Sequence, residues 1–321
     1  MKKKEDIEKL EDTDELEEIE DEEEIEEEND DDEEVEEKPK RGRKVFNALI
    51  FIVMIFIVLV MYAKYGGTKG LIVKEYRVES KILTSNFSGI KIVHISDILY
   101  KSTVDNSDIR DLIERVNILK PDIIVFTGNL VSKNAKMTTK DTEFLVSELS
   151  KMHANIGKYA IYGDYDYDFK SFENVITASG FKILNNEFDE VFYKTNESMY
   201  IVGLPSSSKE TVDLTKAFEF YNDLERKYTI VLLHEGKTIK YLDDSTYEVD
   251  LILGGHSLNG SIVLPFYGGV IKDKSNYKYS KPEYTKGITK IYMSSGMGTR
   301  EYDYRFLNKP SFNLYRLKAQ N

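Results

Sequence analysis

The chain lacks cysteine and tryptophan, and it has little histidine. None of its 321 residues is Cys or Trp, which excludes a disulfide scaffold, thiolate zinc sites and cysteine nucleophiles. Any metal must therefore be held by oxygen and imidazole, and the only histidines are His94, His153, His234 and His256. A hydrophobic fraction of 41%, with 12% aromatic residues, is sufficient to build a core.

Charge is distributed unevenly along the chain. Residues 1–44 contain 24 acidic and 9 basic side chains, a net charge of −15, whereas residues 45–321 contain 33 acidic and 35 basic ones. Repulsion among like charges opposes compaction, so we predict that residues 1–44 form a disordered acidic tail that ends in a basic segment. The remainder is near neutral, without the cationic surface that nucleic acid requires, and we predict no nucleic-acid partner.

One long apolar run separates this tail from the rest of the chain. Residues 45–63 carry no charge, and a helix of this length spans about 28 Å, enough for the hydrocarbon core of a bilayer. The run is apolar on every face, which argues against the helix of a soluble core. It starts far from the N-terminus and has no clear cleavage site, which argues against a cleaved signal peptide. We therefore predict a transmembrane helix over residues 45–63.

The residues that flank this helix predict its orientation. Only Lys64 and Lys69 follow it closely, whereas five basic residues lie just before it: Lys38, Lys40, Arg41, Arg43 and Lys44. The positive-inside rule then predicts a single-pass protein of the cell membrane, with a cytoplasmic N-terminus and an extracytoplasmic C-terminal domain. Glycine-rich residues 64–70 are expected to form a flexible linker, and residues 71–321 the domain.

Apolar runs typical of buried strands alternate with helical patterns from residue 71 onward. One helix is expected to begin at a Ser107 cap and to stop at Pro121. The runs are almost continuously apolar, as in a sheet that is covered on both faces, so we predict an α/β fold. The expected strands are 71–78, 90–95, 122–126, 158–162, 199–202, 229–233, 251–253 and 288–293.

Five polar residues each follow one of these strands within a few positions: Asp97, Asn129, Asp164, His234 and His256. Ligands of open α/β sheets bind outside the carboxyl ends of the strands. Taken singly, each residue has a structural explanation, such as a cap, a turn or a core histidine. Taken together, they predict one site at one edge of a sheet.

The segments that carry these residues resemble the calcineurin-like metallophosphoesterase superfamily, and in particular its bacterial membrane-associated branch. The similar segments are 92–99, 121–129, 159–166, 231–235 and 253–261. The resemblance implies a four-layer α/β/β/α sandwich with a two-metal site, typically of Mn, Fe or Zn, that hydrolyses phosphate esters. It extends from about residue 76 to the C-terminus.

The first metal position of the family is degenerate in this sequence. The resemblance assigns its four ligands to Asp97, Leu99, Asn129 and Leu258. Leucine has no lone pair to donate, and an amide is a weaker ligand than the carboxylate that normally bridges two ions. We therefore expect this position to be lost, with Asp97 as its remnant.

The second metal position keeps a full set of donors. The resemblance assigns it to Asn129, Asp164, His234 and His256, where the carboxylate and the amide have exchanged places. One carboxylate, one amide and two imidazoles suit a divalent ion such as Zn or Mn. We predict at most one divalent ion rather than the two of the family; the alternative is a drifted site that binds none.

The catalytic position of the family is also altered. Its general acid, a histidine, corresponds to Tyr165, which is followed by Asp166. A phenol with an ordinary pKa near ~10 is a poor general acid at neutral pH, so no catalytic residue is intact. Arg300 or Lys101 is a candidate for holding a substrate phosphate.

These features predict a membrane-anchored metallophosphoesterase-like protein that is inactive or weakly active as a hydrolase. Its expected partners are the membrane and a phosphate-bearing ligand or an envelope component. One alternative is a single-metal phosphoesterase that hydrolyses an extracytoplasmic phosphate ester. Another is a membrane adaptor that acts through its acidic tail.

Overall fold

The computed structural model describes residues 41–221, 225–270 and 278–320. The chain divides into two compact units, residues 1–51 and 52–321. Most of the predicted acidic tail lies outside the described residues, and its last four residues, 41–44, are helical.

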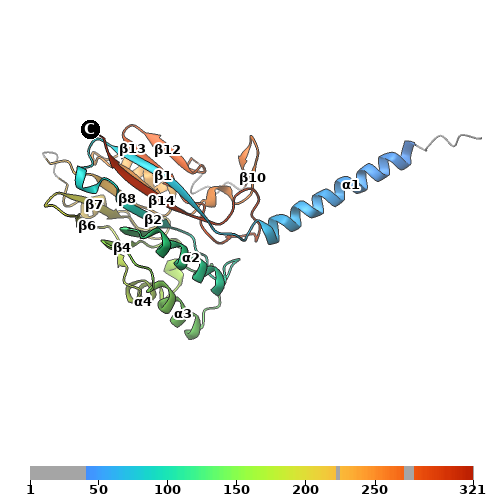
Figure 1. Ribbon diagram of the computed structural model, residues 1–321, viewed down its shortest axis with the longest axis horizontal. Helices are drawn as coiled ribbons and strands as arrows, with labels where there is room; N and C mark the ends of the chain where they lie inside the picture. The colour runs from blue at the N-terminus through green and yellow to red at the C-terminus, as the bar shows by residue number, and fades with distance from the viewer. Residues whose placement is uncertain (1–40, 222–224, 271–277, 321) are drawn as a thin grey trace, which may run out of the picture. The chain divides into compact units, whose positions relative to one another are not determined.

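Helix α1 (Arg41–Met61) continues into a π-helical turn, η1 (Tyr62–Gly66). Its apolar side chains are exposed along the whole helix, which is drawn as the long blue helix in Figure 1. Residues 42–66 are long and apolar enough to cross a membrane, and none of the most apolar stretch is buried. The helix begins four residues before the predicted start at residue 45 and so includes the basic residues Arg41, Arg43 and Lys44.

The segment 64–70, which we predict to be a flexible linker, is ordered and packed onto the domain. Thr68 is buried, and its hydroxyl donates to the carbonyl of Lys64 at 2.7 Å. Lys69 forms an ion pair with Asp108 at 2.7 Å. A Cβ atom at Gly67 would lie 1.7 Å from the carbonyl oxygen of Arg305, so glycine is required there by close backbone packing. These residues therefore pack against the domain, and the division of the chain at residues 64–70 stays a prediction.

Two six-stranded sheets form the domain. The first has the order β1-β14-β2-β3-β4-β5, in which β14 is antiparallel to β2 and all other neighbours are parallel. Its strands are β1 (Ile72–Ser80), β2 (Lys91–Ile95), β3 (Ile123–Phe126), β4 (Gly157–Ala160), β5 (Lys182–Ile183) and β14 (Ser311–Ala319).

The second sheet has the order β12-β13-β9-β8-β7-β6, with a parallel centre and two antiparallel edge strands. Its strands are β6 (Glu187–Phe192), β7 (Ser198–Gly203), β8 (Thr229–Leu232), β9 (Leu251–Gly254), β12 (Glu283–Lys286) and β13 (Thr289–Met293). A separate small hairpin joins β10 (Val263–Leu264) to β11 (Gly268–Gly269).

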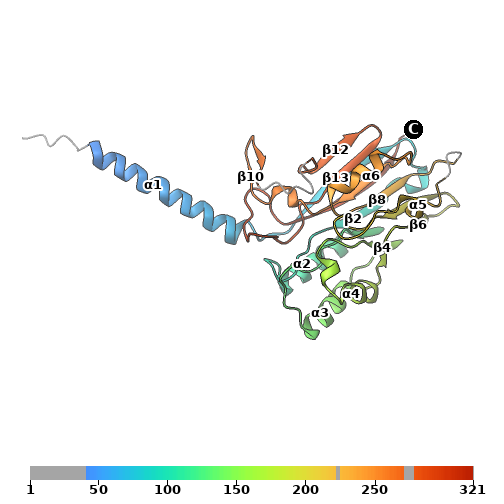
Figure 2. The same cartoon turned by 180° about the vertical axis from the view of Figure 1, so that it is seen from behind.

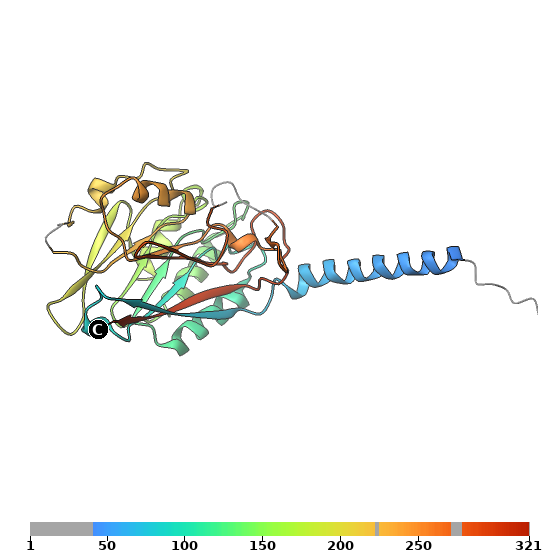
Figure 3. The same cartoon turned by 90° about the horizontal axis from the view of Figure 1, so that it is seen from above.

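The two sheets pack face to face between two layers of helices (Figures 2 and 3). Ile92 of β2 belongs to a core shared by the two sheets, whereas Val93 belongs to a core shared with the helices outside the first sheet. Those helices are α2 (Asn106–Leu119), α3 (Thr139–Leu149) and α4 (Phe172–Ala178), and α5 (Leu214–Ala217) and α6 (Ile239–Asp243) pack on the second sheet. The short 3-10 helices are η2 (Ser85–Phe87), η3 (Asp166–Asp168), η4 (Gly236–Thr238) and η5 (Leu258–Gly260). The predicted α/β/β/α sandwich is confirmed.

Helix α2 begins earlier than the sequence indicated. The Asp105 carboxylate accepts from the backbone N–H groups of Ser107 and Asp108 at 2.8 and 3.2 Å. Asp108 accepts in return from the N–H of Asp105 at 2.9 Å, which completes a capping box. The predicted Ser107 cap is wrong because the aspartate two residues earlier forms this reciprocal pair.

Strand directions fix which end of the domain carries the predicted site. Strand β1 follows the helix in the chain. Strand β2 runs antiparallel to β1, because β14 is parallel to β1 and antiparallel to β2. The carboxyl end of β2 therefore lies at the end of the sheet where β1 begins. The site at this edge and the exit of the apolar helix are at the same end of the domain.

Candidate metal centre

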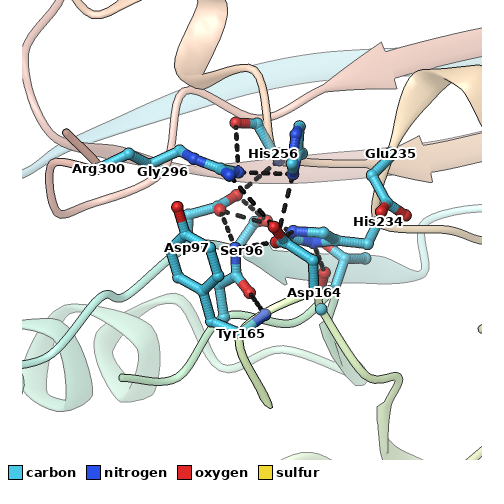
Figure 4. Close-up of polar contacts among 12 residues, drawn as sticks. Ser96, Asp97, Asp164, Tyr165, His234, Glu235, His256, Gly296 and Arg300 are labelled. Atoms are coloured by element: carbon cyan, nitrogen blue, oxygen red, sulfur yellow. Dashed lines mark hydrogen bonds and ion pairs between the residues drawn. The ribbon is translucent and has the colours of Figure 1, made fainter. Parts of the chain in front are cut away.

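The five polar residues predicted from the strand ends meet at this end of the domain, but they come from both sheets rather than from one. Asp97, Asn129 and Asp164 follow strands of the first sheet, and His234 and His256 follow strands of the second. They follow the carboxyl ends of β2, β3, β4, β8 and β9, and Figure 4 shows four of them pointing toward one another: Asp97, Asp164, His234 and His256. The chain turns sharply after three of these strands, because Asp97, Asn129 and His256 have φ angles of 47°, 62° and 66°.

Three side chains present ligand atoms that face one another. The ligand atoms of Asp164, His234 and His256 lie within 4.8 Å of one another. Asp164 Oδ1 is 3.1 Å from His234 Nε2 and 3.4 Å from His256 Nδ1. A carboxylate with two imidazoles is a suitable donor set for a divalent ion such as Zn or Mn, so these residues fit a metal.

The buried imidazole of His234 is oriented by the backbone. Its Nδ1 lies 2.6 Å from the carbonyl oxygen of Thr127. That oxygen only accepts, so Nδ1 carries the hydrogen, and Nε2 is left facing the Asp164 carboxylate. Burial disfavours a charge on His234, but the carboxylates of Asp97 and Asp164 outweigh it and raise its pKa to about 9. The two carboxylates thus favour a positive charge next to Nε2.

Arg300 provides such a charge beside His256. Its Nη1 is 2.5 Å from His256 Nδ1, and its Nη2 is 3.2 Å from Asp164 Oδ2 (Figure 4). A guanidinium only donates, so His256 Nδ1 accepts, and its lone pair is engaged by Arg300. Burial would raise the pKa of Asp164, but His234 and Arg300 together hold it far below its usual range. Arg300 also lies 4.6 Å from the centre of the Tyr165 ring.

Asn129 presents nitrogen rather than oxygen to this site. Its Nδ2 donates to Asp97 Oδ1 at 3.1 Å and to Asp164 Oδ1 at 2.9 Å. Its Oδ1 accepts from the backbone N–H of Tyr165 at 2.9 Å. The opposite amide orientation would place an oxygen against two carboxylates. This arrangement therefore differs from the amide-oxygen ligand that we predict for Asn129.

The other residues that the resemblance assigns to the first metal position, Asp97, Leu99 and Leu258, are buried. Asp97 is fully buried, and its Oδ2 accepts from the hydroxyl of Ser96 at 2.6 Å and from the N–H of His256 at 2.8 Å. Leu99 and Leu258 are 0% and 2% exposed. A Cβ atom at Gly296 would lie 2.7 Å from both Asp97 Cβ and Leu258 Cδ2, so this leucine packs close to the carboxylate.

Tyr165 and Asp166 have different environments. Burial raises the pKa of the Tyr165 phenol, which makes it a still weaker proton donor at neutral pH. Asp166 is buried and accepts from the N–H groups of Asn129, Leu130 and Gly163 at 2.6 to 2.8 Å. Burial raises its pKa to about 7, and the three N–H donors act in the opposite direction. Asp166 therefore braces the loops that carry Asn129 and Asp164.

Lys101, the alternative phosphate-binding candidate, lies outside this group. Its ammonium pairs with Asp141 of α3 at 2.5 Å. Of the two basic residues considered, only Arg300 reaches the cluster.

The sequence analysis did not identify two buried residues of this region. Glu235 is buried beside His234 and accepts from the hydroxyls of Ser206 and Ser208 at 2.6 and 2.5 Å; its position directly after a strand-end histidine was the available signal. Arg305 is fully buried, and its guanidinium bonds four backbone carbonyls. No pattern in the sequence distinguishes it from the other arginines.

A four-layer sandwich with a carboxylate and two imidazoles at the strand ends of its two sheets is suited to a divalent metal. The chain belongs to the calcineurin-like phosphoesterase family, whose model matches residues 90–260. The predicted resemblance is thus confirmed. The family typically binds divalent metals.

Individual relatives cover most of the chain. It is 30% identical over 263 residues to the uncharacterized metallophosphoesterase YkuE of Bacillus subtilis, which covers 81% of this chain and 90% of that protein. It is 25% identical to the UDP-2,3-diacylglucosamine pyrophosphatase LpxG of Chlamydia trachomatis, over 72% of this chain and 84% of that protein. A transmembrane protein with a metallophosphoesterase domain from Danio rerio is 23% identical, over 68% of this chain and 51% of that protein.

Proposed function

We propose that this protein is a membrane-anchored member of the family that binds a phosphate-bearing ligand and has little or no two-metal phosphoesterase activity. The observation that carries this proposal is the first metal position, where Leu99 and Leu258 are buried. Asp97 has hydrogen-bond donors on both oxygens: Asn129 on Oδ1, and Ser96 and the His256 N–H on Oδ2. A carboxylate already supplied with donors gains little from an ion that would have to displace them.

One divalent ion, Zn or Mn, would be held by Asp164, His234 and His256. When bound, it would act as a Lewis acid toward a phosphoryl oxygen. Arg300 pairs with the same carboxylate and imidazole, so an ion at these ligands would displace its guanidinium from both groups. A guanidinium is suited to a phosphate, which arginine recognises through two parallel hydrogen bonds.

A single-metal phosphoesterase is the second candidate function, and the convergence of three ligand atoms within 4.8 Å supports it. The absence of a histidine at position 165 weighs against it, because loss of a general acid typically lowers the rate about 10²–10⁴-fold. The third alternative, an adaptor that acts through its acidic tail, concerns residues outside the described part of the chain.

Hydrolysis of an aryl phosphate with Mn or Zn tests this proposal. We expect detergent-purified full-length protein to turn over the ester no faster than its His234→Ala variant. The matched control is His153→Ala, which removes an exposed histidine. Activity that His234→Ala abolishes and His153→Ala preserves would instead establish the single-metal hydrolase.

The helix supports a location at the cell membrane. Residues 42–66 have the length and composition of a membrane span, and basic residues gather at its N-terminal end. We propose that the N-terminus is cytoplasmic and that the domain lies outside, where an envelope component or an extracytoplasmic phosphate ester would meet it.

A further inference from the structure

The hairpin β10–β11 exposes apolar side chains at its tip. Phe266 is 111% exposed, and its neighbours Leu264 and Tyr267 are 42% and 65% exposed. Tyr302 and Leu307, in the segment that precedes β14, are 60% and 56% exposed. Such a concentration of apolar surface usually marks an interaction site.

The backbone of the tip holds Phe266 outward. Phe266 has a φ angle of 65°, a left-handed conformation in which a bulky residue is unusual and glycine or asparagine is favoured. Strained positions of this kind cluster at functional sites. Folding of the domain alone does not account for phenylalanine there, since its ring is fully exposed.

Direct contacts link the hairpin to the end of the apolar helix. The N–H of Val263 donates to the carbonyl of Phe306 at 2.9 Å, and the N–H of Arg305 donates to the carbonyl of Ala63 at 2.9 Å. The rings of Tyr62 and Phe306 meet edge to face, with centroids 5.9 Å apart. The segment 305–306 thus joins the hairpin to the last turn before the domain, and Figures 1 and 2 show β10 beside this end of α1.

We propose that the hairpin tip docks into the interface of the same bilayer that the helix spans. Aromatic side chains are favoured at the head-group level, where an apolar ring meets a polar surface. The occupant is lipid, because the segments that carry the exposed side chains are bonded to the end of the proposed membrane-spanning helix. These side chains are Phe266, Tyr267, Tyr302 and Leu307. The docked tip gives the domain a second attachment and turns the end of the domain that carries Asp164 and His234 toward the head groups.

This inference rests on the proposed membrane anchor, and the lack of tryptophan in the chain allows a direct test. Full-length Phe266→Trp protein would be reconstituted in phosphatidylcholine–phosphatidylglycerol vesicles whose acyl chains carry bromine, a contact quencher. The matched control is Phe192→Trp. Phe192 is also exposed, at 52%, but it pairs with Ser198 at the start of β7, at the opposite end of the sheet from His234.

We expect the indole fluorescence of the Phe266→Trp variant to shift to the blue in vesicles and to be lost with brominated lipid, while the emission of the Phe192→Trp variant stays unshifted and unquenched. Equal, unquenched emission from both variants in protein that floats with the vesicles would overturn the docking proposal and leave the anchor intact. Failure of both variants to float with the vesicles would overturn the anchor, and the docking proposal with it.

Discussion

A metal ion at the candidate site would compete with Arg300 for two side chains. The guanidinium of Arg300 engages His256 Nδ1 and Asp164 Oδ2, so an ion that binds Asp164, His234 and His256 has to displace it. The affinity of the site for a metal ion is therefore expected to depend on Arg300.

We predict that Arg300→Gln raises the affinity for zinc about tenfold, because the ion no longer competes with a guanidinium. Isothermal titration of zinc into the full-length protein in detergent measures the change. Lys101→Gln is a suitable control, since Lys101 pairs with Asp141 away from these ligands. An unchanged or lower affinity in Arg300→Gln would refute competition.

For single residues, the sequence predicts which side chains form the site better than it predicts how those side chains are oriented. Asp164, His234 and His256 each follow an apolar strand, and ligands of α/β sheets bind at such strand ends. That the strands belong to two sheets is a property of the fold. The direction of the Asn129 amide depends on the N–H of Tyr165 and on two carboxylates, which no local pattern encodes. The pairing of Arg300 joins residues 44 and 136 positions apart and is a property of the fold.

Among the connecting elements, the loop 294–299 depends on a single buried side chain. Arg305 donates to the carbonyls of Ser295, Gly296 and Gly298, and also to that of Asn308. Burial lowers its pKa to about 10, so it remains charged at neutral pH. It holds the loop against Asp97 and Leu99.

We predict that Arg305→Met lowers the free energy of unfolding by about 3 kcal/mol or more, because several buried carbonyls lose their donors. Thermal unfolding of the full-length protein in detergent measures this loss. Arg316→Met is the control, as Arg316 bonds only at an exposed position. A melting temperature equal to that of the wild type would contradict this role.

Strand β1 carries a lysine whose environment makes stability depend on pH. Lys74 donates to the hydroxyl of Ser295 at 2.6 Å, and burial, with the nearby charge of Arg305, lowers its pKa to about 8. The unfolded chain, with the ordinary value of 10.5, then binds more protons than the folded chain between pH 8 and pH 10.5. Stability contributed by this group therefore rises with pH across that window.

We predict that the free energy of unfolding of the wild type rises by about 1–2 kcal/mol relative to Lys74→Met between these pH values. Denaturant unfolding of both proteins across the pH range gives the difference, and other titrating groups cancel in the comparison. A constant difference would contradict the lowered pKa of Lys74.

The order of the helices and strands could be predicted from the sequence, but the residues at which they begin and end were harder to predict. Apolar runs gave the strands around the site, because buried parallel strands carry a strong signal. The start of α2 was misplaced, since Ser107 and Asp105 are both good caps and only the reciprocal bond with Asp108 decides between them. The segment 64–70 reads as a linker by its glycines, but Gly67 serves close packing against Arg305.

For the whole molecule, the apolar helix and the sandwich were both evident from sequence, whereas the orientation in the membrane stays a prediction. The chain has no cysteine, so single-cysteine variants report sidedness directly. We predict that Glu197→Cys, at an exposed position of the domain, reacts with a membrane-impermeant maleimide on intact cells. Lys3→Cys should react only after lysis, and the reverse pattern would contradict an external domain.

The backbone around the two leucines that the resemblance assigns to the first metal position is suited to histidine. Leu99 and Leu258 have φ angles of 51° and 48°, which histidine tolerates better than leucine. Restoring the ligands of the family with Leu99→His, Asn129→Asp, Asp164→Asn and Leu258→His is therefore compatible with the turns. We expect this variant to bind more metal per chain than the wild type.

The metal content of purified full-length protein, determined by elemental mass spectrometry after saturation with zinc or manganese and removal of excess ion, tests the central claim most directly. The account predicts at most one ion per chain in the wild type, lost in His234→Ala, and two in the restored variant. Two ions per chain in the wild type would contradict it.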